Sequence, residues 1–282
     1  MSRFSYVNGR FLPHAQASIS IDDRGFLFGD AIYEVWSVRH GHLLDSEGHF
    51  ERLKRSLGEL RIPMPIGVPA LRLVIGELLR RNRVDEGLVY LEISRGAARR
   101  DHVFPPAGTR PTLVMTAKRV DFAAADARAE RGIGVISLPD QRWGRCDIKT
   151  VNLLPNVLAK QAAREAGAFE AWQVDDEGFV TEGASSNAWI VTAEGVLVTR
   201  PADHAILHGI TRATILRLAR DAGYDVEERG FTLDEAHGAR EAFITSATTF
   251  VTPVVRIDDR PVGNGAPGSL GSLLRETYLA AP

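Results

Sequence analysis

The sequence predicts an α/β protein of two domains, an α+β N-terminal domain followed by an α/β C-terminal domain. Its 282 residues exceed the usual size of a single domain. Segments typical of strands and helices alternate along the chain, without internal repeats or low-complexity segments. Hydrophobic residues make up 44% and charged residues 25%, which are ordinary values for a globular protein. We expect residues 1–120 to form the first domain, 121–131 the connection, and 132–282 the second domain.

The N-terminal domain is expected to begin with a hairpin. Phe4–Leu12 surrounds Asn8-Gly9, a strong signal for a type I′ turn. Ala31–Arg39 has the pattern of a strand and turns at His40-Gly41. Apolar residues at intervals of three and four then predict two amphipathic helices, followed by two strands. These helices and strands are expected at Ser46–Leu60, Leu71–Asn82, Gly87–Ser94 and Thr112–Val120.

The C-terminal domain is expected to follow Phe122–Arg131, an alanine-rich and charged segment that is either the connection or a short surface helix. Two hairpins turn at Asp175–Gly178 and Ala193–Gly195. Gly167 and Gly223 each end a predicted helix. The other strands and helices are expected at Gly132–Leu138, Leu154–Ala166, Thr211–Ala222, Leu233–Ala239, Ala242–Ile257 and Ser269–Leu279.

Composition excludes several classes of partner. A formal net charge of −2 gives no reason to expect binding to nucleic acid or to an anionic membrane. No segment approaches the ~20 apolar residues of a membrane span, and the first residues lack the apolar core of a signal peptide. Cys146 is the one cysteine, so an intrachain disulfide is excluded, and we expect a cytoplasmic protein. His204 and His208 have metal-pair spacing but lack a third ligand, so no metal is expected.

Two motifs carry a lysine and a glutamate. Asp147-Ile148-Lys149-Thr150-Val151-Asn152 holds Lys149, one of four lysines in an arginine-rich chain. Thr181-Glu182-Gly183-Ala184-Ser185-Ser186-Asn187 follows it. Pyridoxal phosphate chemistry requires an amine that forms a Schiff base with the cofactor aldehyde, and a carboxylate that keeps the pyridine nitrogen protonated. Taken singly, each residue is equally explained as a surface lysine or as a turn glutamate.

Together the two motifs resemble those of the fold type IV pyridoxal phosphate enzymes, the family of the branched-chain and D-amino acid aminotransferases. The resemblance implies that pyridoxal 5′-phosphate lies in the cleft between the domains. It implies that Lys149 is the catalytic residue and the Schiff-base lysine, and that Glu182 pairs with the pyridine nitrogen. It also makes Ser186 and Asn187 cofactor-binding residues.

The cofactor phosphate needs N–H donors and cations. His208-Gly209-Ile210-Thr211-Arg212 opens a predicted helix, and the N–H groups at a helix N-terminus bind phosphate. The resemblance selects the Ile210 and Thr211 amides with the Thr211 hydroxyl. In Ser246-Ala247-Thr248-Thr249 it selects Ala247 and Thr248, where Ala247 contributes no hydroxyl. In His49-Phe50-Glu51-Arg52-Leu53 it alone selects Arg52, because Arg55 is an equally good cation.

The substrate residues follow from two further segments. The stretch from Arg24 through Tyr33 to Val35 resembles the first active-site strand of the family and places Tyr33 and Val35 at the substrate. Arg100-Asp101-His102 resembles the carboxylate trap of bacterial D-amino acid transaminases, formed here by Arg100 and His102. In those enzymes this loop reaches the active site of the neighbouring subunit, which implies a homodimer with its active site at the subunit interface. Without the resemblance, the same loop reads as a solvated basic segment.

The resemblance therefore implies transamination of D-amino acids such as D-alanine, with a 2-oxo acid such as 2-oxoglutarate as acceptor. The reaction would be ping-pong through pyridoxamine phosphate. The alternatives are an aminodeoxychorismate lyase, a branched-chain or (R)-amine transaminase on the same fold, and a relic that binds without turnover. The pair of Arg100 and His102 argues against the lyase and against the other transaminases.

Overall fold

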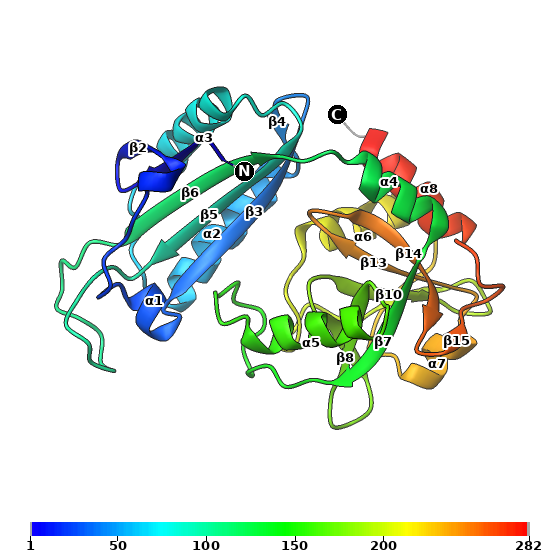
Figure 1. The fold of residues 1–282 in the computed structure, drawn as a ribbon. Coiled ribbons are helices and arrows are strands. Elements are labelled where there is room, and N and C mark those ends of the chain that lie inside the picture. Colours follow the sequence, from blue (N-terminus) through cyan, green and yellow to red (C-terminus); the bar gives the residue numbers. More distant parts are fainter. Residues whose placement is uncertain (1, 281–282) are drawn as a thin grey trace. The chain divides into compact units, whose positions relative to one another are not determined.

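The computed structural model describes residues 2–280, whose contacts form two compact units (Figure 1). The first unit contains the chain up to Phe122 together with Ile148–Asn152. The second contains Ala123–Asp147 and the chain from Leu153 onward. None of the described helices combines the length and apolar character that a membrane crossing requires.

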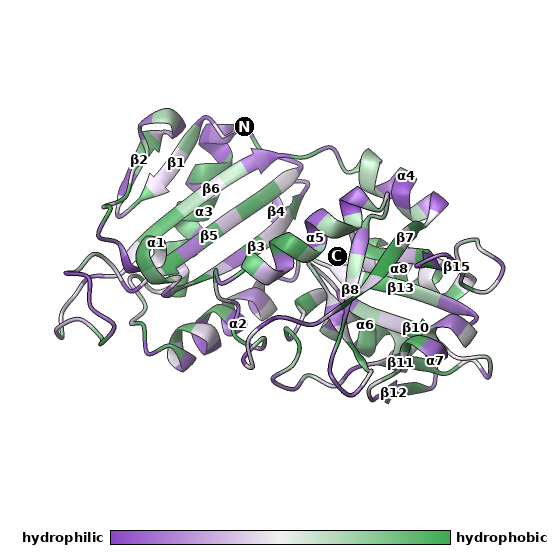
Figure 2. Ribbon diagram, turned by 60° about the horizontal axis from the view of Figure 1, so that its bottom comes forward, coloured by the Kyte–Doolittle hydropathy of each residue, from purple (hydrophilic) through white to green (hydrophobic). Residues whose placement is uncertain are grey.

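The first unit is built on a six-stranded, fully antiparallel sheet in the order β2-β1-β6-β5-β3-β4. Helices α2 and α3 bury their apolar residues against it in one core. The central strands are mostly hydrophobic, whereas α2 carries many hydrophilic residues (Figure 2). The elements are β1 (Phe4–Val7), β2 (Arg10–Pro13), η1 (His14–Gln16), α1 (Arg24–Phe28), β3 (Ala31–Arg39), β4 (His42–Leu43), α2 (Ser46–Glu59), α3 (Val68–Asn82), β5 (Gly87–Ser94) and β6 (Thr112–Arg119).

The expected hairpin, strands and helices of this unit are confirmed, with α3 beginning three residues earlier than expected. Asn8 and Gly9 have φ values of 46° and 92°, as a type I′ turn requires. Residues 24–28 differ, because the family's first active-site strand was expected to include them. Asp23 caps a short helix there by accepting a hydrogen bond from the Gly25 amide, and left-handed Gly29 ends it.

Strand β3 has two different faces. Ile32, Glu34 and Trp36 are fully buried, and both apolar side chains belong to the core formed with α2 and α3. Tyr33 and Val35 alternate with them and are half-buried on the opposite face of the sheet. The strand thus separates a buried acidic residue from two residues that face away from the core.

Ile148–Asn152 joins the first unit through β3. The Tyr33 amide donates to the Lys149 carbonyl at 2.9 Å, and the Val151 amide donates to the Ala31 carbonyl at 3.2 Å. An isolated bridge pairs Ile32 with Thr150. The expected second domain, residues 132–282, would have kept this segment, whereas its hydrogen bonds group it with the first unit.

The second unit contains a nine-stranded mixed sheet in the order β12-β11-β10-β13-β14-β7-β8-β9, with β15 paired to β14. Strand β7 is parallel to β14 and β8, and β11 is parallel to β12. Helices α4, α6 and α8 pack against β13 and β14, and α5 packs against β7 and β8. The elements are α4 (Ala123–Arg131), β7 (Ile133–Pro139), α5 (Leu154–Glu165), β8 (Glu170–Val174), β9 (Val180–Gly183), β10 (Asn187–Val191), β11 (Leu197–Thr199), α6 (Ile210–Asp221), β12 (Val226–Glu228), α7 (Leu233–Gly238), β13 (Glu241–Ser246), β14 (Phe250–Ile257), β15 (Arg260–Pro261) and α8 (Ser269–Ala280).

Most expected elements of this unit are confirmed within one or two residues at each end. The segment from Ala123 to Arg131, for which a connection and a surface helix were both considered, is helix α4. Ala125 and Ala129 are buried, and Asp126 pairs with Arg275 of α8 at 2.6 Å. This helix therefore packs within the second unit, whereas the sequence suggested an interdomain connection.

Candidate active site

Lys149 presents its amine to an aromatic ring. Its Nζ lies 4.3 Å from the centre of the Tyr33 ring. Tyr33 in turn stacks on Tyr90, with ring centres 5.7 Å apart. Among the described residues Nζ takes part in no hydrogen bond and no ion pair. An amine without a carboxylate partner loses its proton more readily than a salt-bridged one, which suits a nucleophile.

A buried ionic cluster lies on the core side of β3. Arg52 donates to both oxygens of Glu34, from Nε at 2.7 Å and from Nη2 at 2.8 Å. His49 Nδ1 lies 2.8 Å from Glu34 Oε2. Burial alone would raise the pKa of Glu34, but the charge and hydrogen bonds of Arg52 and His49 lower it to about 2. Burial lowers the pKa of His49, and the charges of Arg52 and Lys149 add to that effect. Arg52, expected at the phosphate, thus contacts Glu34 with two of its nitrogens.

The other predicted substrate residues also lie in the first unit. Arg100 and His102 are exposed on the connection between β5 and β6. The guanidinium carbon of Arg100 lies 5.2 Å from the centre of the Phe28 ring, and the His102 ring lies 5.5 Å from it. Val35 pairs with Tyr90 across β3 and β5. Phe28 therefore brings the predicted carboxylate-binding pair together.

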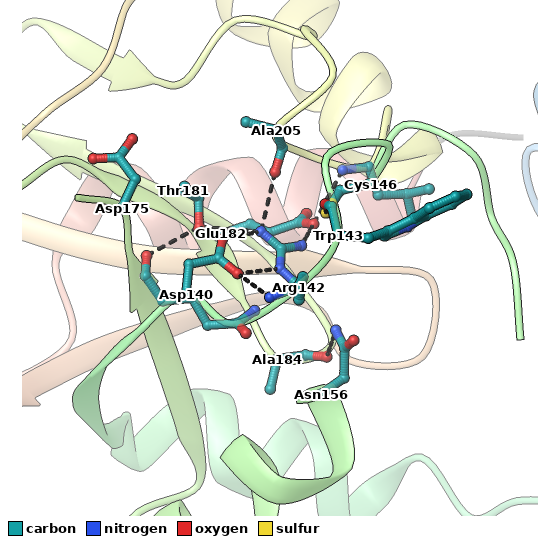
Figure 3. Close-up of polar contacts among 12 residues, drawn as sticks. Asp140, Arg142, Trp143, Cys146, Asn156, Asp175, Thr181, Glu182, Ala184 and Ala205 are labelled. Carbon is teal, nitrogen blue, oxygen red and sulfur yellow. Dashed lines mark hydrogen bonds and ion pairs between the residues drawn. The ribbon is translucent and has the colours of Figure 1, made fainter. Parts of the chain in front are cut away.

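Glu182 lies in the second unit near the end of β9 and is almost fully buried. Its Oε2 accepts from Asn187 Nδ2 at 2.8 Å, and its Oε1 accepts from the Leu207 amide at 3.1 Å. Oε1 also accepts from Arg142, as Figure 3 shows. Three donors, one of them charged, favour the ionised carboxylate.

Arg142 was not found by the sequence reasoning. Its guanidinium joins Glu182 to Asp140, whose Oδ2 lies 2.7 Å from Nη2 (Figure 3). Burial alone would lower the pKa of Arg142, but the charges of Glu182 and Asp140 raise it. Burial alone would raise the pKa of Asp140, but the bonds to Arg142 and Thr181 lower it. The sequence offered one weak signal, an Asp-x-Arg pair seven residues before Lys149.

Glu170 was missed as well, although it fixes the turn that carries Ser186. Its Oε2 accepts from Ser185 Oγ at 2.7 Å and from Ser186 Oγ at 3.1 Å. Lys160 Nζ lies 3.2 Å from its Oε1. Glu170 is fully buried on β8, so the turn before Asn187 is tied to the sheet.

The predicted phosphate residues open helix α6. Gly209 precedes the helix in an extended conformation, and no side chain caps the first-turn amides of Ile210 and Thr211. Thr211 Oγ1 is buried and has no hydrogen-bond partner. A Cβ added to Gly209 would overlap with the Asn187 amide, so glycine is needed for this close approach. An unpaired buried hydroxyl at an uncapped helix N-terminus fits a bound anion.

The second predicted phosphate segment is the turn between β13 and β14. Ser246 Oγ lies 2.9 Å from Thr249 Oγ1 and 3.4 Å from Thr248 Oγ1. Ala247 and Thr248 are both half-buried in this turn. Phe250 follows with a left-handed φ of 60°. Hydroxyl groups gather here in the second unit, as they do at the start of α6.

Comparison with known proteins decides the family. The family model for class IV aminotransferases matches residues 31–257. This chain belongs to the class IV aminotransferases. It is 41% identical to a D-alanine aminotransferase of Bacillus licheniformis, over 93% of this chain and 91% of that protein. It is 38% identical to a D-alanine aminotransferase of Staphylococcus aureus (strain MSSA476), over 97% of this chain and 95% of that protein.

Solved structures of the fold agree with this assignment. A branched-chain amino acid aminotransferase from T.th., determined with pyridoxamine 5′-phosphate, superposes with a TM-score of 0.89. The two sequences are 28% identical, and the match covers 99% of this chain and 93% of that one. The fold type IV architecture expected from the sequence is thereby confirmed.

In this class IV aminotransferase the predicted site residues fall into two sets, each described within its own unit. The set of the first unit comprises Tyr33, Val35, Arg52, Arg100, His102 and Lys149. The set of the second unit comprises Glu182, Ser186, Asn187, Ile210, Thr211, Ala247 and Thr248. The first set offers an amine and two exposed cationic or basic side chains, and the second offers a carboxylate and the phosphate donors.

Proposed function

We propose that this protein is a pyridoxal 5′-phosphate-dependent D-amino acid aminotransferase. The donor would be a small D-amino acid such as D-alanine, and the acceptor a 2-oxo acid such as 2-oxoglutarate. The observation that carries the proposal is the Lys149 amine, which lies over the Tyr33 ring without an acidic partner among the described residues. The likeness to two D-alanine aminotransferases over more than nine-tenths of the chain supports the choice of substrate.

The residues present fit this cofactor. The Thr211 hydroxyl, buried without a partner, and the Ile210 and Thr211 amides would hold its phosphate, with Thr248 and the Ala247 backbone adding contacts. Ser186 and Asn187 would bind it beside Glu182. When bound, the cofactor supplies an aldehyde for the amino group and a ring that withdraws electrons from the substrate Cα.

Lys149 and Glu182 would do the chemical work of the protein. The Lys149 amine would bind the cofactor aldehyde covalently at rest and be released when a substrate amine replaces it. The released amine would then take the proton from the substrate Cα. Glu182, kept ionised by Arg142, would hold a proton on the pyridine nitrogen. Arg52 remains a predicted phosphate cation, although Glu34 takes two of its nitrogens.

Arg100 and His102 would select the substrate by its α-carboxylate. A guanidinium binds a carboxylate through two parallel N–H bonds, and an imidazole adds a third donor. Tyr33 and Val35, on the outer face of β3, would line the position of the substrate. Fixing the carboxylate determines which Cα–H bond faces Lys149, and so determines the hand of the amino acid.

The first experiment records the visible absorption of the purified holoenzyme before and after addition of D-alanine, with L-leucine in a parallel sample. We expect the cofactor band to change with D-alanine alone. A change with L-leucine alone would move the assignment to the branched-chain class. No change with either would favour the lyase or the amine transaminase. Borohydride reduction and peptide mass spectrometry should place the cofactor on Lys149, and Lys149→Ala should abolish that attachment.

The proposal includes a homodimer in which Arg100 and His102 serve the site of the other subunit. Mixing two inactive variants, Lys149→Ala and Arg100→Ala, tests this arrangement. If the loop acts across the interface, each mixed dimer contains one complete site, and dissociation followed by reassociation should restore activity toward D-alanine. Absence of recovery in a verified mixed dimer would mean that each chain uses its own Arg100.

A further inference from the structure

The trap loop, residues 95–111 between β5 and β6, contains no helix and no strand. Arg100, Asp101 and His102 are exposed on it. A loop of this length without secondary structure is ordinarily mobile. Mobile side chains lose conformational freedom when they bind a ligand, which weakens binding. The contacts that hold this loop therefore bear on how well it binds a carboxylate.

Arg24 ties the middle of the trap loop to the interior. Its side chain is only 4% exposed at the start of helix α1. Its Nε donates to Asp30 Oδ2 at 2.8 Å, and its Nη1 donates to the Asp101 carbonyl at 2.6 Å. Asp101 lies between the two predicted carboxylate-binding residues. A buried charged side chain thus fixes the backbone between them, and its planar fork sets the direction of that bond.

Phe28 lies four residues after Arg24 on the same helix and contacts the side chains themselves. Its ring centre is 5.2 Å from the Arg100 guanidinium carbon and 5.5 Å from the His102 ring. The guanidinium carbon of Arg24 is 4.7 Å from the same ring. Cation–π and ring contacts at these distances favour one arrangement of flexible side chains.

A second arginine holds the two ends of the trap loop. Arg95 donates to both oxygens of Asp30, at 2.7 and 2.9 Å, and to the Leu60 carbonyl at 2.7 Å. Its guanidinium carbon lies 3.7 Å from the centre of the Phe104 ring, beyond His102 in the chain. Burial alone would raise the pKa of Asp30, but the hydrogen bonds of the two arginines lower it. Asp30 therefore remains ionised and connects both anchors.

We propose that Arg24 and Phe28 are positioning residues, which hold the trap loop ready for a substrate carboxylate before any substrate arrives. Neither residue is assigned a contact with substrate or cofactor. This inference rests on the proposed function, because it takes Arg100 and His102 as the carboxylate-binding pair. It predicts that the two positioning residues affect recognition of the carboxylate and leave the chemistry at Lys149 unchanged.

The test compares Phe28→Leu with Phe26→Leu in the holoenzyme. Phe26 lies on the same helix, is 72% exposed, and serves as the matched control. Phe28→Leu should raise KM for D-alanine about tenfold, the effect of mobilising two side chains. We expect little change in kcat, in cofactor absorbance or in turnover of an amine that lacks a carboxylate. Phe26→Leu should change none of these quantities.

A second readout does not depend on activity. Trypsin cleaves after arginine, and Arg99 and Arg100 are exposed in the trap loop. A loosened loop should be cut several-fold faster at these residues in Phe28→Leu than in Phe26→Leu. Arg24→Lys should act in the same direction, because a single ammonium group lacks the fork that spans Asp30 and the Asp101 carbonyl.

The outcomes separate this inference from the function on which it rests. If Arg100→Ala raises KM for D-alanine while Phe28→Leu changes neither KM nor the cleavage rate, the positioning role is wrong and the carboxylate assignment stands. If Arg100→Ala leaves KM unchanged, the carboxylate assignment fails, and this inference fails with it. Faster cleavage together with a raised KM in Phe28→Leu alone supports both.

Discussion

Arg52 and Glu34 form a two-pronged ion pair in which the carboxylate is fully buried. The pKa of Glu34 is about 2 in the folded protein, against an ordinary value of 4.5. A depressed pKa contributes stability above the ordinary value, and this contribution is lost as the pH falls toward the folded value. The shift corresponds to about 3 kcal/mol at neutral pH.

Glu34→Gln should therefore destabilise the protein at pH 7, and its deficit relative to the parent should shrink between pH 4.5 and about 2. Urea unfolding of both proteins at several pH values measures this difference. Glu51→Gln is the matched control on the exposed side of helix α2 and should show no such pH dependence. A deficit of constant size across that range would show that Glu34 does not titrate as described.

Thr211→Val should weaken cofactor binding without destabilising the apoprotein. The Thr211 hydroxyl is buried and unpartnered, so its loss removes a donor that only a ligand would use. We expect a loss of about 1–1.5 kcal/mol in cofactor affinity, roughly tenfold in Kd. Thr199→Val is the control, because the Thr199 hydroxyl donates to the Ala188 carbonyl and its loss should lower apoprotein stability instead. Cofactor titration and thermal unfolding give the two readouts.

Arg142→Met should destabilise the protein by about 3–5 kcal/mol, because it leaves the Asp140 and Glu182 carboxylates without their shared cation. Adding Asp140→Asn removes one of the stranded charges and should recover part of that loss. The double-mutant cycle is measured by chemical unfolding of the four proteins. Strict additivity of the two single changes would contradict the coupling.

Gly76→Ala should stabilise the protein by about 0.5–1 kcal/mol. Gly76 lies inside helix α3, where a Cβ would meet nothing within 4 Å and alanine has the better helix propensity. Gly87→Ala is the opposing control, since its Cβ would overlap with the Lys118 carbonyl across β5 and β6. Thermal unfolding should move the two midpoints in opposite directions.

The sequence predicted most of the fold because its signals were local. Asn8-Gly9 specifies its turn by conformation, and the spacing of Phe50, Leu53 and Leu57 specifies a helix. Helix α1 was missed because five residues give no periodic pattern, and its cap at Asp23 stands alone. The linker-like composition of the segment before β7 concealed helix α4, whose burial rests on alanines.

The site divides in the same way. The motifs around Lys149 and Glu182 were found because their residues are consecutive in the chain. The partners of Glu34 and Glu182 were not found, because Arg52 is 18 residues from Glu34 and Arg142 is 40 residues from Glu182. Pairing over such separations is set by the sheet, and the sequence of either strand alone does not encode it.

The chain passes between the two units three times, after Phe122, after Asp147 and after Asn152. A gene cut at the first crossing would therefore not produce two self-sufficient halves. The N-terminal fragment would lack the hydrogen bonds that Lys149 and Val151 make with β3, and with them its amine. A chimera of two relatives joined near Phe122 would pair the strand of one parent with the lysine segment of the other. Recombination within this family should respect a boundary that is discontinuous in sequence, with Ile148–Asn152 inherited together with the first 122 residues.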